Sequence, residues 1–236
     1  MALGVFTRLK RTEHPAGRYL LLRGRGLMNR ARRGHVVRRR AVRRHLESPE
    51  PSLHIGAGPK TLDGWLNSDL IGGDVHLDLE RPLPLPDACL AYVFGEHVIG
   101  SLSDQAAMRL LRELHRVLRP GGVLRLTTPD LEKLIAIYRD ENPVVTREDY
   151  VRYLDAETGE AHGTPCQLFN DGVRLWGIRY TYDEEDLTRR LREAGFAEVQ
   201  PVEPGESSHA ALRGLEQHGE PWVNRAEALC LEATRH

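Results

Sequence analysis

Residues 53–58, Leu-His-Ile-Gly-Ala-Gly, decide the fold because they predict a strand that runs directly into a glycine turn. Glycines at the carboxyl end of a first strand let a ligand approach the backbone closely, at the crevice of a doubly wound sheet. The stretch departs from the dinucleotide-binding motif, since Lys60 and Leu62 stand where further glycines are expected. We therefore expect a ligand site at this turn.

The sequence around and after this turn alternates strands and helices, which is typical of an open, mostly parallel sheet with crossover helices. The patterns predict strands over 51–55, 65–70, 75–79, 90–94, 123–127, 198–202 and 229–233, and helices over 103–118, 131–138 and 183–194. Ser103 is the expected N-cap of the helix over 103–118, and the segment Pro120-Gly121-Gly122 is expected to end it. Residues 140–171 are polar with weak periodicity and predict no definite element.

Charge is divided unevenly along the 236 residues, whose formal net charge is only −1. Residues 1–50 hold 14 of the 33 Lys and Arg residues and three of the 34 acidic residues, which gives this segment +11 and the rest of the chain −12. Opposite charges of this size favour docking of one part on the other. We predict a basic, Arg-rich helical extension over 1–50 that serves as a lid, and one α/β domain over 51–236.

Three widely spaced cysteines, Cys89, Cys166 and Cys230, form no CxxC pair, so the sequence indicates neither a disulfide framework nor a zinc cluster. No apolar run reaches the roughly 18–20 residues of a membrane span. The hydrophobic fraction of 40% is that of an ordinary globular protein. A cytoplasmic protein is the resulting expectation.

Two aspartates end predicted strands near the glycine turn. Asp69 ends the second strand, where an acidic residue can accept hydrogen bonds from both hydroxyls of a ribose. Asp78 ends the third strand. Each has an alternative interpretation as a simple turn residue, but together with the turn they favour a ligand that contains a nucleoside.

Several stretches resemble, in order and spacing, the small class I S-adenosylmethionine-dependent methyltransferases of bacterial polysaccharide and glycan gene clusters. These stretches are LHIGAG, GWLNSDL, LDLERPLPLPD, AYVFGEHVIGSL and LLRELHRVLRPGGVLRLTTPDLEKL, and the likeness resumes at YTYDEEDLTRRLREAGF. The resemblance implies a Rossmann-like, doubly wound α/β fold with a cofactor half over 51–130 and an acceptor region over 131–236. It also implies S-adenosyl-L-methionine as the cofactor.

The resemblance further implies roles for individual residues in cofactor binding. Gly56, Ala57 and Gly58 would line the methionine part of the cofactor, and Asp69 would hold its ribose. Asp78 and Leu79 would contact the edge of the adenine. Gly95 and Glu96 would border the amino-acid moiety. The chain departs from the family at His54, which replaces the usual acidic residue before the glycine turn.

Methyl transfer to a hydroxyl requires a group that removes its proton, and a histidine with a pKa near neutrality suits that step. His97, just after the fourth strand, is the first candidate, and His209 is the second. Activation by Mg²⁺ is an alternative, although no ligand spacing in the sequence specifies a metal site. Tyr180, Tyr182 and Glu206 are expected to bind the acceptor, with core packing an equal alternative for the tyrosines.

A saccharide hydroxyl is the expected acceptor, for example in an oligomannoside or glucoside precursor of a methylated polysaccharide. The acidic body suits a neutral polyhydroxyl molecule better than a polyanion. A phenol or another natural product is an alternative, and the basic segment also suggests nucleic acid, a membrane surface or a protein partner. Against RNA, only Phe6 and Tyr19 offer aromatic rings in that segment, and no NPPY-like tetrad follows the fourth strand. A homodimer stays an open expectation.

Overall fold

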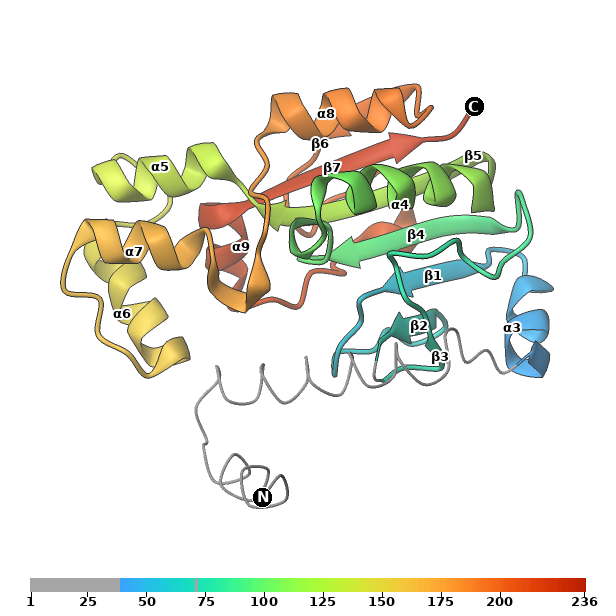
Figure 1. The fold of residues 1–236 in the computed structure, drawn as a ribbon, viewed down its shortest axis with the longest axis horizontal. Helices are drawn as coiled ribbons and strands as arrows, with labels where there is room; N and C mark the ends of the chain where they lie inside the picture. Colours follow the sequence, from blue (N-terminus) through green and yellow to red (C-terminus); the bar gives the residue numbers. More distant parts are fainter. Residues whose placement is uncertain (1–38, 71) are drawn as a thin grey trace, which may run out of the picture.

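A seven-stranded sheet forms the centre of the protein (Figure 1). The computed structural model describes residues 39–70 and 72–236. The strands are β1 (Ser52–Ile55), β2 (Leu66–Asp69), β3 (Val75–His76), β4 (Leu90–Glu96), β5 (Leu118–Pro129), β6 (Glu198–Pro201) and β7 (Ala228–Thr234). Their order is β3-β2-β1-β4-β5-β7-β6, with β1 to β5 parallel and β7 antiparallel to both of its neighbours. This order confirms the predicted Rossmann-like sheet of the class I methyltransferase type.

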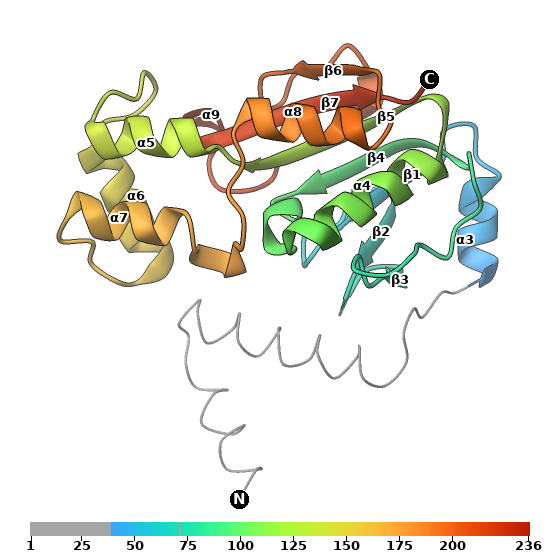
Figure 2. The ribbon, with the colours of Figure 1, turned by 45° about the horizontal axis from the view of Figure 1, so that its top comes forward.

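Six of the α-helices that the structure describes form two groups around this sheet, and α3 lies apart from both groups (Figures 1 and 2). Both views show α4 and α8 on one face of the sheet, and α5, α6, α7 and α9 gathered at the end toward which β4 and β5 point. The helices are α3 (Arg39–Leu46), α4 (Asp104–Val117), α5 (Leu131–Arg139), α6 (Arg147–Thr158), α7 (Pro165–Gly172), α8 (Glu184–Glu193) and α9 (Pro221–Glu227). The second group therefore surrounds the carboxyl ends of the parallel strands, where ligands bind in open α/β sheets.

Helix α4 forms where the sequence predicts it, because its capping and its apolar spacing agree. The Ser103 hydroxyl accepts a hydrogen bond from the Ala106 N–H, as an N-cap residue should. Leu110, Leu111 and Leu114 fall on one stripe of the helix and are at most 1% exposed. They pack against the apolar side chains of the sheet and form the main hydrophobic core.

The end of α4 differs from the prediction. The helix stops at Val117, and Leu118 already pairs with Leu90 as the first residue of β5. The glycines that follow shape the start of the strand instead, since Gly121 has a φ of +76° and its N–H donates to the Arg235 carbonyl. A backbone bond to the carboxyl-terminal strand, which is remote in sequence, therefore sets this boundary.

The opposite face of the sheet is covered by the segment over 202–219, whose one helical turn is the 3-10 helix η3 (Ala210–Leu212). Leu212 and Leu215 of this segment pack against Phe94 and Val123 of the sheet in a smaller apolar cluster. Beside that cluster, the fully buried Arg125 holds the segment by ion pairs and carbonyl contacts. This face is therefore far more polar than the α4 face.

Helices α6 and α7 occupy the region for which the sequence predicted no definite element. Thr146 caps α6 by accepting from the Asp149 N–H, and Thr164 caps α7 by accepting from the Gln167 N–H. Together with α5 the two helices enclose a separate apolar cluster of Leu134, Ile137, Tyr150, Leu154 and Leu168. Threonine three residues before an acidic or amide side chain is a helix-start pattern that would have predicted both helices.

The amino-terminal extension is described only from Arg39 onward. Helix α3 begins there, and Val42 on its apolar side is 6% exposed and belongs to the main core. The predicted lid over 1–50 lies mostly outside the described residues and stays a prediction. Within residues 39–70 and 72–236, no helix combines the length and apolar character that a bilayer crossing requires.

Candidate active site

The glycine turn after β1 has the backbone geometry that only glycine adopts readily. Gly56 has a φ of +66°, and a Cβ built there would stand 2.7 Å from Cγ2 of Val98. Gly58 has a φ of +53°, and a Cβ on it would meet no atom within 4 Å. Its N–H donates to Oδ2 of Asp69 over 3.1 Å. The end of β2 is therefore tied directly to the turn, and the space in front of Gly58 is open.

A cavity of about 510 Å³ opens at this turn. Its wall includes Gly56, Ala57 and Gly58 on one side, and His97, Tyr150, Tyr153, His218 and Glu227 on the other. The first set follows β1, whereas the second comes from the end of β4, from α6, from the loop before α9 and from the last residue of α9. The cavity therefore joins the predicted cofactor half to the acceptor region.

His97 projects into this cavity from the residue that follows β4. Its φ of +51° is uncommon for a residue with a side chain, and its N–H donates to the Thr127 carbonyl over 3.0 Å. Nε2 is inaccessible to solvent and has no hydrogen-bond partner among the described residues. Burial holds the pKa of His97 well below its usual range, and the positive charge of Lys60 contributes in the same direction. The imidazole is therefore neutral at pH 7.

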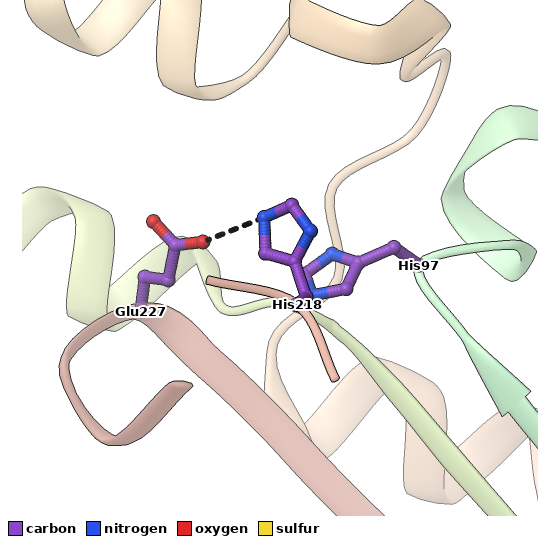
Figure 3. A group of neighbouring side chains, drawn as sticks. All are labelled: His97, His218 and Glu227. Atoms are coloured by element: carbon purple, nitrogen blue, oxygen red, sulfur yellow. Dashed lines mark ion pairs between the residues drawn. The ribbon is translucent and has the colours of Figure 1, made fainter. Parts of the chain in front are cut away.

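His218 and Glu227 stand beside His97 (Figure 3). The two imidazole rings have centroids 4.3 Å apart, and Nε2 of His218 is 3.7 Å from Oε1 of Glu227. Burial lowers the pKa of His218 to about 4 and raises the pKa of Glu227 to about 7. The other oxygen of Glu227 accepts a hydrogen bond from the Tyr150 hydroxyl. Two neutral imidazoles and a buried carboxyl thus share one end of the cavity.

Glu96 and Lys60 hold the loop that carries His218. Both carboxylate oxygens of Glu96 accept the Gln217 N–H, over 2.9 and 3.2 Å, and one of them also accepts the His218 N–H over 2.9 Å. The Lys60 ammonium donates to the Gln217 carbonyl. The predicted cofactor residue Glu96 thus lines the cavity and also fixes the loop that carries His218.

The other predicted cofactor residues have structural contacts and lie outside this cavity lining. Asp69 is among them, since it contacts the turn through the Gly58 N–H, and its ribose assignment stays a prediction. Asp78 is 6% exposed, accepts the Glu80 N–H and pairs with Arg81 over 3.3 Å, and Leu79 belongs to the main core. A Cβ on Gly95 would stand 2.9 Å from Cγ1 of Ile55, so packing alone requires glycine there. The adenine and amino-acid assignments of these residues stay predictions.

The predicted acceptor residues are not brought to the cavity. Tyr182 is 1% exposed and packs with Tyr180, whose hydroxyl donates to Asp186 and whose ring lies under the Arg190 guanidinium. Glu206 is exposed, and its carbonyl accepts a bond from buried Arg125. His209, the second candidate base, packs edge-on against Tyr92 and is absent from the cavity lining. For the tyrosines the structure favours the core-packing alternative.

His218, Glu227 and Tyr150 were not singled out by the sequence. His218 and Glu227 lie more than 120 residues after His97, and no local motif connects them. Tyr150 lies in the segment for which the sequence predicted no definite element, so its place on a helix face was not expected. Only the antiparallel return of β7 along β5 brings Glu227 to the carboxyl end of the sheet.

A second, shallower groove adjoins the cavity at Tyr153, which lines both. It has a volume of about 820 Å³, and polar and aromatic side chains from the α5–α6 connection, from α6 and from α9 line it. These side chains are Asn142, Asp149, Arg152, Tyr153 and Trp222. Aromatic faces beside amide, carboxylate and guanidinium groups are suited to a polar ring-shaped ligand.

Comparison with known proteins finds that the central part of the chain is similar to methyltransferases. Residues 63–126 match the family model described as a methyltransferase domain. Two proteins of Mycobacterium tuberculosis, from strains CDC 1551 and H37Rv, are each described as a probable S-adenosylmethionine-dependent methyltransferase. Each is 41% identical to this chain over 98 residues, which are 39% of this chain and 34% of the relative. The match thus spans about a third of the length of these curated relatives.

Solved structures with a similar fold include two S-adenosylmethionine-dependent methyltransferases. The protein from Archaeoglobus fulgidus is 15% identical with a TM-score of 0.45, over 89% of this chain and 94% of that one. The protein from Mesorhizobium loti is 19% identical with a TM-score of 0.44, over 83% of this chain and 96% of that one. Residues 63–126 are thus similar to a methyltransferase domain, and the sheet order agrees with the predicted Rossmann-like fold.

Proposed function

We propose that this domain transfers the methyl group of S-adenosylmethionine to a hydroxyl of a saccharide, such as an oligomannoside or a glucoside. The observation that carries the proposal is the single cavity whose wall joins the glycine turn to the end occupied by His97, His218 and Glu227. A cofactor bound at one side and a hydroxyl bound at the other would meet inside this cavity. Positioning of this kind supplies much of the acceleration of a displacement reaction.

The cofactor side of the proposal rests on the turn at Gly56–Gly58 and on Asp69. The open space in front of Gly58 allows a ligand to contact the backbone there, and Asp69 fixes the turn through its bond to the Gly58 N–H. Asp69 would also hold the ribose hydroxyls with its carboxylate. When bound, S-adenosylmethionine supplies a methyl group activated by an adjacent sulfonium.

The acceptor side of the proposal rests on His97 and its neighbours. A saccharide hydroxyl is a poor nucleophile, so its proton must leave as the new bond forms. The neutral imidazole of His97 lines the cavity, and its Nε2 has no hydrogen-bond partner among the described residues. Because this atom is buried, a small rotation of the ring would bring it to such a hydroxyl as the acceptor of a hydrogen bond. Glu227, held through its other oxygen by Tyr150, provides a nearby carboxyl group for the same proton.

The saccharide character of the acceptor is supported by the groove that adjoins the cavity at Tyr153. The ring of Tyr153 lies 5.4 Å from that of Trp222, edge to face, beside Asn142 and Asp149. Sugar rings present apolar C–H faces to aromatic side chains and hydroxyls to amides and carboxylates. A chain of sugar units would therefore extend from the cavity into this groove.

The experiment is methyl transfer from labelled S-adenosylmethionine by the full chain to a panel of mannosides, glucosides, phenols and RNA. We expect labelled product with saccharides only. His97→Ala should lower kcat about 10²–10⁴-fold, the usual contribution of a positioned base, while S-adenosylhomocysteine still binds. Product with phenols or RNA alone would replace the saccharide proposal, and preferential binding of NAD would refute the cofactor assignment.

Cofactor binding is tested separately by calorimetry with S-adenosylhomocysteine. Asp69→Ala should weaken binding by about 1.5–3 kcal/mol, the usual cost of losing hydrogen bonds to a charged group. Asp69→Asn keeps an acceptor for the Gly58 N–H, so it separates the ribose contact from support of the turn. The exposed Asp63, replaced by alanine, is the matched control. Equal affinity of all four proteins would refute the role of Asp69.

A further inference from the structure

We propose that His97, His218 and Glu227 form a binding site for a divalent transition-metal ion of the Zn²⁺ type. The proposal deepens the proposed function and rests on it, since it puts a Lewis acid where the acceptor hydroxyl would be activated. With an ion bound, the ligating nitrogen of His97 cannot also accept the proton. The metal would then replace His97 as the activating group, and the proton of the hydroxyl would pass to solvent water. Metal binding itself does not depend on methyl transfer and is measured without it. No ligand spacing in the sequence indicates a metal, because the three residues meet only in the folded chain.

The three side chains form the donor set. Each offers one ligand atom, and these atoms all lie within 4.8 Å of one another (Figure 3). They come from three separate elements, namely the end of β4, the loop before α9 and the last residue of α9. Donor atoms around a tetrahedral Zn²⁺, bound at about 2.0–2.1 Å, stand roughly 3.3 Å apart. Small side-chain rotations would therefore complete the site.

The spacing and pairing of these groups suit a metal. The two imidazole rings have centroids 4.3 Å apart, and Nε2 of His218 is 3.7 Å from Oε1 of Glu227. A buried polar nitrogen without a partner is unfavourable, and Nε2 of His97 is such an atom. A bound ion would satisfy it. Glu227 would supply the one negative charge of the set through Oε1.

Neighbouring residues fix the positions of two of these ligands, Glu227 and His218. The Tyr150 hydroxyl donates to Oε2 of Glu227 and leaves Oε1 directed toward His218. The Glu96 carboxylate fixes the backbone of His218. Partners of this kind orient metal ligands and raise their affinity. The nearby positive charge of Lys60 opposes a cation, so we expect moderate rather than very tight binding.

The donor set also decides which metal fits. Two imidazoles and one carboxylate are the ligands of many Zn²⁺, Fe²⁺ and Co²⁺ sites, whereas Mg²⁺ prefers oxygen ligands alone. The site therefore differs from the Mg²⁺ site considered for the sequence. Three protein ligands leave a coordination position for the acceptor oxygen, and coordination lowers the pKa of that hydroxyl.

The test is a calorimetric titration of the untagged, metal-free full chain with Zn²⁺ alone. A parallel titration uses Mg²⁺ in its place. We expect one Zn²⁺ per chain and no binding of Mg²⁺ at the same concentrations. His218→Ala and Glu227→Gln should each weaken Zn²⁺ binding at least about tenfold, in the way that loss of one ligand does. His236→Ala is the matched control, because this histidine is exposed and lies at the carboxyl terminus.

X-ray absorption of the Zn²⁺-loaded wild-type protein identifies the atoms bound to the ion. It tests the proposal even if a variant fails to fold. Nitrogen and oxygen ligands without sulfur are expected, whereas a sulfur ligand would assign the ion to a cysteine such as the exposed Cys166. Absence of Zn²⁺ binding, or binding unchanged in His218→Ala, would overturn the site. A chain that binds Zn²⁺ through these ligands but methylates no acceptor would refute only the proposed function.

Discussion

The two faces of the sheet are built from different chemistry. On the α4 face, Leu53, Val93 and Leu124 of the strands meet the leucine stripe of α4, and all are fully buried. On the opposite face, Arg125 is equally buried but pairs with Glu216 and Glu232, each over 2.7 Å. Hydrophobic contacts accept many partners, whereas this ion cluster needs three particular side chains. The α4 face is therefore specified by the spacing of apolar residues, whereas the opposite face is specified by individual ion pairs.

Arg125→Met should have the largest effect on stability. It would leave Glu216 and Glu232 buried without their cation, and removal of one partner from a buried ion pair costs about 3–5 kcal/mol. Urea unfolding at pH 7, followed by circular dichroism, measures the loss of unfolding free energy.

Arg125→Lys sharpens this prediction. Lysine keeps the charge but cannot reproduce the guanidinium geometry that contacts both carboxylates and the Glu206 carbonyl, so an intermediate loss is expected. If Arg125→Met unfolds at the wild-type urea concentration, the polar face does not depend on its ion cluster.

Leu111→Ala probes the apolar face and should cost slightly less, about 3 kcal/mol, within the usual range of about 2–5 for a buried leucine. Leu111 is fully buried in the main core, so its removal leaves a cavity. Conservative replacement with methionine should cost less than about 1.5 kcal/mol, because volume-conserving exchanges are tolerated in such cores. A loss from Leu111→Met as large as that from Leu111→Ala would contradict the idea that this face accepts alternatives.

Glu113, on the edge of α4, should give the smallest effect and a distinct pH dependence. Hydrogen bonds from Arg116 hold the pKa of Glu113 below its usual value, and the Leu83 N–H contributes in the same direction. A lowered pKa stabilises the fold above the unfolded-state pKa of about 4.3, and that stabilisation disappears as the pH falls through the folded-state value. Glu113→Gln should therefore cost about 1 kcal/mol at pH 7.

The control for Glu113→Gln is the same comparison in acid. At a pH below the folded-state pKa of Glu113, wild type and variant should unfold with nearly the same free energy. A difference that persists unchanged in acid would show that the amide changes packing rather than charge.

The sequence predicted several elements of residues 51–130 well for a local physical reason. The glycine turn, the position of β2 and the cap of α4 at Ser103 all depend on residues adjacent in the chain. The sequence also predicted all seven strands of the described residues, although only some of them, such as β4, are largely buried apolar runs, whereas β6 is mostly exposed. Strand β3 is shorter than predicted, ending at His76 rather than Leu79.

The acceptor side was predicted poorly because its contacts are long-range. His97 was identified next to a strand end, whereas Glu227 reaches the cavity through the return of β7, and His218 is held there by the bond from its N–H to Glu96. His209 and Tyr182 had suitable chemistry but are turned toward other partners, Tyr92 and Arg190. Chemical type is visible in a sequence, but the direction of a side chain in a loop is not.

The bond between Glu96 and the His218 N–H joins residues 122 positions apart, and this separation has a consequence for the order of folding. Contacts between distant residues form late, because the chain must first lose the entropy of a long loop. The ribosome releases the glycine turn and β1 to β5 well before His218 is synthesised. A nascent chain therefore forms the glycine turn after β1 early, and it brings His218 next to His97 last. Truncation before β7 would yield a domain without a complete cavity.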